Sequence, residues 1–203
     1  MNLEKLSLER LSGENIRLAN LIKQDFNPDL VIYIAKGGYI IGRDISRALN
    51  AKLIEVHAAR KGNHLKKMLA PLLVYVPQDI CNYLRKIELR TSIHNVNSDR
   101  CVFFPEKLSD DLSQKSSKIL IVDDSVDTGN SVKAVKEKIF ENFTNIEDVR
   151  VAALNVWSKS LDIVKTDYYI WRDTILVTPM SKDSSEYRAF LELYNKHKFG
   201  GGK

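Results

Sequence analysis

Apolar positions along the chain fall into two patterns, which predict alternating strands and helices. Continuous apolar runs rich in β-branched residues predict buried parallel strands, at residues 30–35, 51–57, 118–122, 149–157 and 175–178. Apolar residues three or four positions apart predict amphipathic helices, at residues 12–26, 39–49 and 130–140. The alternation predicts an α/β fold, in which helices cover both faces of a mainly parallel twisted sheet.

The stretch from residue 58 to 117 departs from this alternation. It has no clean periodicity, it carries scattered basic residues, and Pro77 suggests a helix that runs through residue 90. A structureless connection of about sixty residues is uncommon inside a compact domain. We therefore predict that residues 1–203 form a single domain with a partly helical insertion at residues 58–117.

Composition narrows the class of protein. Hydrophobic residues make up 44% of the chain, which is enough for a full core, and no apolar run approaches the ~20 residues of a membrane span. The polar first ten residues do not resemble a signal peptide, so we expect a cytoplasmic protein. The two cysteines and four histidines lack the spacing of a disulfide framework or a metal site. A net charge of +5 suits a polyanionic ligand, but it would also suit weak contact with nucleic acid.

The most informative segment is the loop that follows the predicted strand 118–122. Its sequence from Val122 is Val-Asp-Asp-Ser-Val-Asp-Thr-Gly-Asn-Ser131, which leads into a helix. A helix amino terminus and nearby hydroxyl groups favour a bound phosphate, whereas the paired carboxylates of Asp123 and Asp124 can accept hydrogen bonds from two ribose hydroxyls. The alternative is that an Asp-rich turn only caps the helix.

This segment resembles the signature of the type I phosphoribosyltransferases: an apolar strand, two acidic residues, two further residues, then Asp-Thr-Gly and a hydroxyl residue. The resemblance implies that Asp123 and Asp124 hold the ribose hydroxyls and that the rest of the loop surrounds the 5′-phosphate. The other implied donor-binding residues are Ser125, Val126, Thr128, Gly129, Asn130 and Ser131. In the purine-using members, the residue at Asp127 manages a proton of the base, so Asp127 is the predicted catalytic residue.

Two further segments extend the resemblance, which is strongest to the hypoxanthine-guanine and xanthine-guanine enzymes. The loop Lys36-Gly37-Gly38 resembles their pyrophosphate-binding loop, although its alternative is an ordinary turn between a strand and a helix. Residues 157–180 take the place of the base-binding hood. The implied base-binding residues are Lys159, Trp171, Ile175 and Leu176. The family's flexible loop would begin near residues 59–61, where the long insertion departs from the family's compact pattern.

The resemblance implies transfer of a phosphoribosyl group from 5-phosphoribosyl-1-pyrophosphate to a nucleobase, with a 6-oxopurine as the expected acceptor. Mg²⁺ would arrive with the donor pyrophosphate, and Asp123 and Asp124 would contact it only through water or ribose. We expect a homo-oligomer and no membrane or nucleic-acid partner. Three alternatives remain: a different acceptor, a donor-sensing regulatory protein that binds nucleic acid, and an interaction module built on the insertion.

Overall fold

A computed structural model describes residues 2–60, 100–104 and 117–199 of the chain. The chain forms two compact units, Met1–Ala58 with Val102–Lys203 and Ala59–Cys101. The predicted helix at residues 77–90 and the basic segment from residue 61 lie outside the described residues. Within the described part of the chain, no helix is long and apolar enough to cross a membrane.

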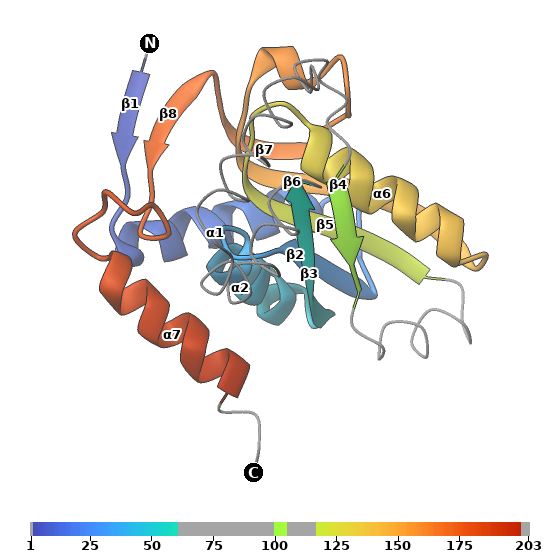
Figure 1. Ribbon diagram of the computed structural model, residues 1–203, viewed down its shortest axis with the longest axis horizontal. Helices are drawn as coiled ribbons and strands as arrows, with labels where there is room; N and C mark the ends of the chain where they lie inside the picture. Colours follow the sequence, from blue (N-terminus) through green and yellow to red (C-terminus); the bar gives the residue numbers. More distant parts are fainter. Residues whose placement is uncertain (1, 61–99, 105–116, 200–203) are drawn as a thin grey trace, which may run out of the picture. The chain divides into compact units, whose positions relative to one another are not determined.

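The described residues form a central sheet and a small second sheet (Figure 1). The central sheet has the order β4 (Arg100–Phe103), β3 (Lys52–Arg60), β2 (Leu30–Ile34), β5 (Ser117–Val126), β6 (Ile146–Val156) and β7 (Tyr168–Arg172). From β3 to β7, neighbouring strands pair in parallel. The second sheet pairs β1 (Asn2–Lys5) in parallel with β8 (Thr174–Val177). These pairings confirm the predicted α/β class.

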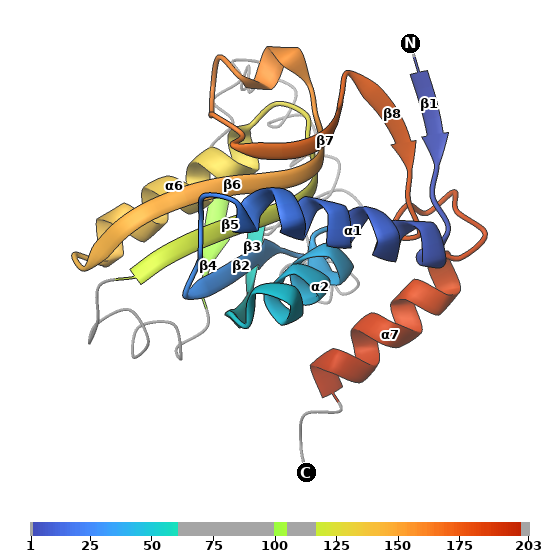
Figure 2. The ribbon, with the colours of Figure 1, turned by 180° about the vertical axis from the view of Figure 1, so that it is seen from behind.

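Helices cover both faces of the central sheet (Figures 1 and 2). The helices are α1 (Leu8–Lys23), α2 (Tyr39–Leu49), α6 (Asn130–Asn142) and α7 (Tyr187–Phe199). Strand β2 shows how two cores arise: Val31 and Tyr33 pack with α1, α2 and α7, whereas Ile32 packs with α6 on the opposite face. Successive strand residues point to opposite faces, so a strand buried on both faces reads as one continuous apolar run.

The structure corrects several predicted boundaries. Helix α1 begins at Leu8 rather than at residue 12, because the side chain of Ser7 accepts a hydrogen bond from the amide of Arg10 and caps the helix. Strand β5 continues through Val126, four residues beyond its predicted end, since this extension pairs with β6. Among the described strands and α-helices, four were not predicted: β1, β4, β7 and α7.

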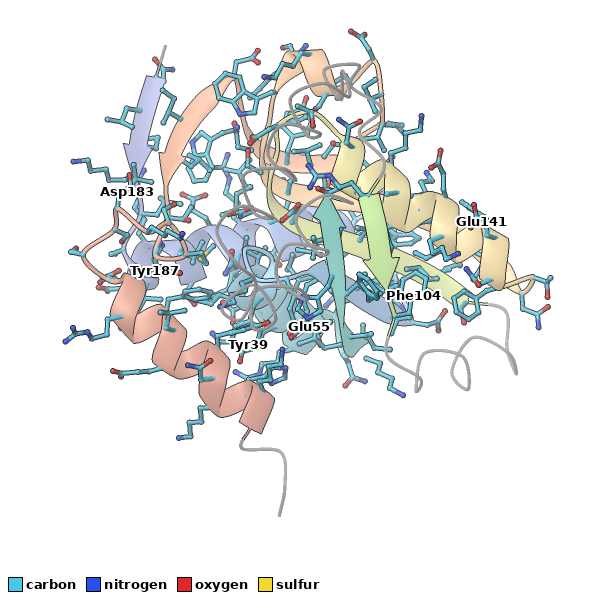
Figure 3. The ribbon with its side chains drawn as sticks, in the orientation of Figure 1. Tyr39, Glu55, Phe104, Glu141, Asp183 and Tyr187 are labelled. Carbon is cyan, nitrogen blue, oxygen red and sulfur yellow. The ribbon has the colours of Figure 1, made fainter. Side chains whose placement is uncertain are left out.

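Helix α7 docks on β3 and α2 through a cluster of aromatic and charged side chains, near Glu55 and Tyr39 in Figure 3. Glu55 accepts hydrogen bonds from the hydroxyls of Tyr33 and Tyr194, at 2.5 and 2.8 Å. Burial of Glu55 raises its pKa, but hydrogen bonds from His57 and the two tyrosines outweigh burial and lower this pKa to about 2. An ionised carboxylate therefore fixes the C-terminal helix to the sheet.

Candidate functional site

The loops after β2 and β5 meet at the carboxyl end of the parallel sheet. A Cβ atom added at Gly37 would lie 2.7 Å from three atoms of the Asp124 carboxyl group. One added at Gly38 would lie 2.6 Å from the carbonyl oxygen of Val122. The peptide bond between Ala35 and Lys36 is cis. Both glycines are thus needed for the close approach of the two loops, which is where open parallel sheets bind ligands.

The paired carboxylates lie at the end of β5, where each is held by the backbone of the next residue. The amide of Asp124 donates to Oδ1 of Asp123 at 3.0 Å, and the amide of Ser125 donates to Oδ1 of Asp124 at 2.9 Å. Burial raises the pKa of both carboxyls above the ordinary value of 3.8, and the charge of Asp124 raises the pKa of Asp123 further. A cation or a hydrogen-bond donor that entered the site would therefore favour the ionised form of the pair.

The remainder of the loop leads into α6. The hydroxyl of Ser125 donates to Oδ1 of Asp127 at 2.6 Å, whereas Asp127 and Thr128 are exposed to solvent. Gly129, with φ 76°, occupies the N-cap position of α6, and a Cβ atom added there would lie 2.8 Å from Val164. Because glycine has no side chain to cap the helix, the first amides of α6 are available to an anion. This geometry favours a phosphate site over an Asp-capped helix.

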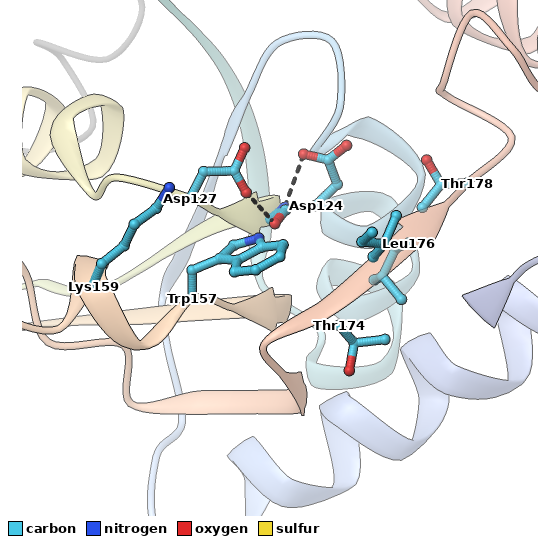
Figure 4. A pocket seen from close by; sticks show the side chains of 9 residues that line it. Asp124, Asp127, Trp157, Lys159, Thr174, Leu176 and Thr178 are labelled. Carbon is cyan, nitrogen blue, oxygen red and sulfur yellow. Dashed lines mark hydrogen bonds between the residues drawn. The ribbon is translucent and has the colours of Figure 1, made fainter. Parts of the chain in front are cut away.

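A cavity of about 390 Å³ adjoins this loop (Figure 4). Its lining residues are Asp124, Ser125, Asp127, Trp157, Lys159, Thr174, Ile175, Leu176 and Thr178. In Figure 4 the Trp157 ring lies between Lys159 on one side and Leu176 on the other. The ammonium nitrogen of Lys159 is 5.7 Å from the centroid of the Trp157 ring. The cavity combines carboxylates, one aromatic wall, an ammonium group and apolar side chains, which suits a planar polar ligand beside a sugar.

The turn between β7 and β8 is tied to the end of β6. Asp173, with φ 51°, accepts a hydrogen bond from the amide of Ser158 at 2.8 Å, and the two side chains also hydrogen-bond. These hydrogen bonds lower the pKa of Asp173. The segment that carries Ile175 and Leu176 is thereby held against the segment that carries Lys159.

Most of the residues singled out in the sequence lie at or next to this cavity, but three side chains lie elsewhere. Val126 is buried in the core that contains the apolar face of α6. Trp171 packs against the core on β7. The ammonium nitrogen of Lys36 lies 5.5 Å from the ring centroid of Tyr194, so this side chain points toward α7. Trp157 was not assigned from the sequence, although its place directly after a buried parallel strand could have indicated a ligand contact.

The described part of the chain contains no group of three or more histidine, cysteine or acidic side chains that could hold a metal ion. The loop does carry two adjacent carboxylates, those of Asp123 and Asp124. Such a pair would fit a divalent cation that kept most of its waters and was held mainly by oxygen atoms of a bound substrate.

The fold and the loop define an α/β protein with a candidate phosphate site at the carboxyl end of its sheet. The chain belongs to the phosphoribosyl transferase domain family, whose model matches residues 9–175. It is therefore a phosphoribosyltransferase, in agreement with the resemblance seen in its sequence. A comparison with curated proteins finds no significant match.

Solved structures share the fold at low sequence identity. A purine phosphoribosyltransferase from Pyrococcus horikoshii is 19% identical with a TM-score of 0.61, over 91% of this chain and 97% of that chain. A xanthine-guanine-hypoxanthine phosphoribosyltransferase from Helicobacter pylori is 14% identical with a TM-score of 0.62, over 93% and 99%. A hypothetical protein from Neisseria gonorrhoeae with bound ppGpp is 15% identical with a TM-score of 0.56, over 97% and 98%.

Proposed function

We propose that this phosphoribosyltransferase joins the 5-phosphoribosyl group of 5-phosphoribosyl-1-pyrophosphate to a ring nitrogen of a 6-oxopurine and releases pyrophosphate. The observation that carries the proposal is the cavity, which places Asp127, Trp157 and Lys159 beside the carboxylate of Asp124. An acceptor in this cavity would lie next to the predicted ribose site. The purine-using enzymes from P. horikoshii and H. pylori, which share the fold, support the choice of acceptor class.

Each wall of the cavity suits one part of an oxopurine. The Lys159 ammonium is a donor-only group, so it would hydrogen-bond to the 6-oxo oxygen. The flat face of Trp157 and the side chains of Ile175 and Leu176 would enclose the base, since aromatic and apolar surfaces favour a planar ring. Asp127 is an acceptor when ionised, so it would take the proton from the ring nitrogen that attacks C1′ of the ribose.

On the donor side, the carboxylates of Asp123 and Asp124 would accept hydrogen bonds from the 2′- and 3′-hydroxyls. The 5′-phosphate would bind the first amides of α6 together with the hydroxyls of Thr128 and Ser131. The loop Lys36-Gly37-Gly38 would bind the pyrophosphate through its backbone groups. The Lys36 side chain would not take part, because it points toward α7. The C1′–oxygen bond breaks as the bond to the acceptor nitrogen forms, so no protein nucleophile is needed.

Mg²⁺ fits the paired carboxylates, since burial raises the pKa of both, and the charge of Asp124 raises the pKa of Asp123 while that of Asp127 raises the pKa of Asp124; a cation would offset this concentration of negative charge. Asp123 and Asp124 would hold it through water or through the ribose oxygens. When bound, the ion would neutralise charge on the departing pyrophosphate.

The test is a Mg²⁺-dependent pyrophosphate-release assay with hypoxanthine, guanine, xanthine, adenine, orotate and uracil, alongside a calorimetric titration of the donor. Release with one or more of the three oxopurines supports the proposal and identifies the acceptor. Release only with adenine, orotate or uracil would refute the oxopurine assignment while leaving the enzyme class intact. Donor binding without release for any base would favour a donor-sensing regulator.

A further inference from the structure

One buried amide side chain connects the hood strand to the donor loop. Asn155, the penultimate residue of β6, is 1% exposed. It is the cross-strand neighbour of Ser125 on one side and of Trp171 on the other. A buried carboxamide must satisfy its donors and its acceptor within the protein, since an unpaired polar group costs about 1–3 kcal/mol. Its partners therefore reveal what this position holds in place.

The two ends of the carboxamide contact opposite sides of the cavity. Oδ1 of Asn155 accepts a hydrogen bond from the backbone amide of Thr174 at 3.3 Å, at the first residue of β8. Nδ2 donates to the hydroxyl oxygen of Ser125 at 3.4 Å. The backbone amide of Thr174 is a donor only, so the atom of Asn155 that faces it must be the oxygen. The nitrogen of the carboxamide must then face Ser125.

This orientation fixes the direction of the next hydrogen bond. Nδ2 of Asn155 is a donor only, so the Ser125 hydroxyl receives its hydrogen bond as an acceptor. The single proton of Ser125 is then free for Asp127, whose Oδ1 lies 2.6 Å away. The chain of donors runs from Thr174 through Asn155 and Ser125 to Asp127. It ends on the carboxylate that the proposed function places beside the acceptor base.

We propose that Asn155 is a positioning residue that sets the Asp127 carboxylate relative to the hood strand β8. This inference rests on the proposed function, because it assigns Asn155 to the proton-managing step of that reaction. Asn155 touches neither substrate; it acts through Ser125 on one side and Thr174 on the other. Its loss should slow transfer far more than it weakens donor binding, because the carboxylates that hold the ribose lie outside this chain of donors.

Two substitutions separate the two hydrogen bonds. Asn155→Leu has nearly the same volume and removes both. Asn155→Asp keeps an acceptor for Thr174 but replaces the donor that faces Ser125, so the hydroxyl proton of Ser125 turns toward the introduced carboxylate and away from Asp127. We expect each variant to lower kcat roughly tenfold. The donor KM should change by less than about threefold. The aspartate variant serves as the second test should the leucine variant fail to fold.

A matched control and a double-mutant cycle distinguish positioning from general destabilisation. Asn15, on α1, is also fully buried and donates to Asp44 at 2.9 Å, away from the cavity. Asn15→Leu should lower the unfolding temperature but leave kcat unchanged. Adding Asn155→Leu to Ser125→Ala should lower kcat no further than Ser125→Ala alone, because both changes interrupt one path. Additive losses, or an equal loss of kcat in Asn15→Leu, would overturn the inference.

Hydrogen exchange at the Thr174 amide tests the contact without turnover. In Asn155→Leu this amide loses its acceptor and should exchange faster, whereas it should keep its wild-type rate in Asn155→Asp and in Asn15→Leu. An unchanged rate in Asn155→Leu refutes the positioning role. A wild-type protein that releases no pyrophosphate with any base refutes the proposed function instead, so the two failures are distinguishable.

Discussion

Gly37 offers the sharpest test of how the two donor-binding loops meet, because any side chain there must displace Asp124. In Gly37→Ala, the added Cβ would lie 2.7 Å from Cγ and from both carboxylate oxygens of Asp124, whereas ordinary contacts begin at 3.4 Å. The carboxyl group must therefore retreat by about 0.7 Å or rotate. Either movement strains its hydrogen bond with the amide of Ser125, now 2.9 Å long.

The size of the effect follows from the proposed contact with the ribose. If the displaced carboxylate loses one hydrogen bond to a sugar hydroxyl, the cost is about 1.5–3 kcal/mol, the usual value for a bond to a charged group. That cost corresponds to a donor Kd raised roughly 10- to 150-fold. Global stability should change little, because the obstructing atoms belong to a short, half-buried side chain at the cavity rather than to the core.

Calorimetric titration of the donor with Mg²⁺ measures this change in Kd directly. Gly13→Ala is the matched control: it lies inside α1, and a Cβ atom added there meets nothing within 4 Å. It should leave donor binding unchanged and stabilise the protein by roughly 0.5–1 kcal/mol, because alanine is the better helix former. Wild-type affinity in Gly37→Ala would refute the role of Asp124 as a sugar ligand held in place by the neighbouring loop.

Three further predictions address the base, the proton and acid stability. Trp157→Leu should raise KM for the acceptor base by roughly tenfold and leave donor Kd unchanged. The reason is that contact between the aromatic ring and the base contributes about 0.5–1.5 kcal/mol of binding free energy in addition to the burial of apolar area. Steady-state kinetics measures the change in KM, and Trp171→Leu is the control. Asp127→Asn should lower kcat by about 10²–10⁴-fold while calorimetry finds donor binding intact; an equal loss of both would show that Asp127 is structural. Because the folded pKa of Glu55 is about 2 and its ordinary value is 4.5, its contribution to stability is complete above pH 4.5 and disappears as pH falls toward 2. Glu55→Gln should therefore weaken the acid dependence of thermal unfolding in that range, and an unchanged dependence would contradict the hydrogen-bonded carboxylate.

The central α/β unit could be read from the sequence because its strands are buried on both faces. Ile32 and Tyr33 pack against opposite layers of helices, so the run that contains them is apolar throughout. Such a run can be recognised in the sequence without knowing where the helices lie. Strand β1 has the opposite character. Leu3 is 55% exposed and β1 pairs with β8, more than 160 residues away, so no local periodicity marks it. Its partner is fixed by tertiary structure.

The candidate site also has one part that the sequence predicts and one part that it does not. The loop from Asp123 to Ser131 is contiguous, so its chemistry was visible in the order of its residues. The partners that orient this loop are not contiguous. Asn155 reaches Ser125 across 30 residues of sequence, and Gly37 reaches Asp124 only because their strands are neighbours in the sheet. A buried asparagine inside an apolar strand was nevertheless a usable signal, since such a group requires partners.

The position of the aromatic wall has a consequence for acceptor selection. Ile175, which the resemblance assigned to the base, is aliphatic, whereas the aromatic ring that lines the cavity is that of Trp157. Trp157 follows β6 directly, and its amide donates to the carbonyl of Val126 at the end of β5. The aromatic wall and Lys159 therefore extend from the central sheet, while β8 supplies Ile175 and Leu176. If the base binds in this cavity as proposed, changes in β8 should alter its fit without removing the aromatic and ammonium groups that line the other wall, so we expect acceptor preference to be most easily changed in this strand.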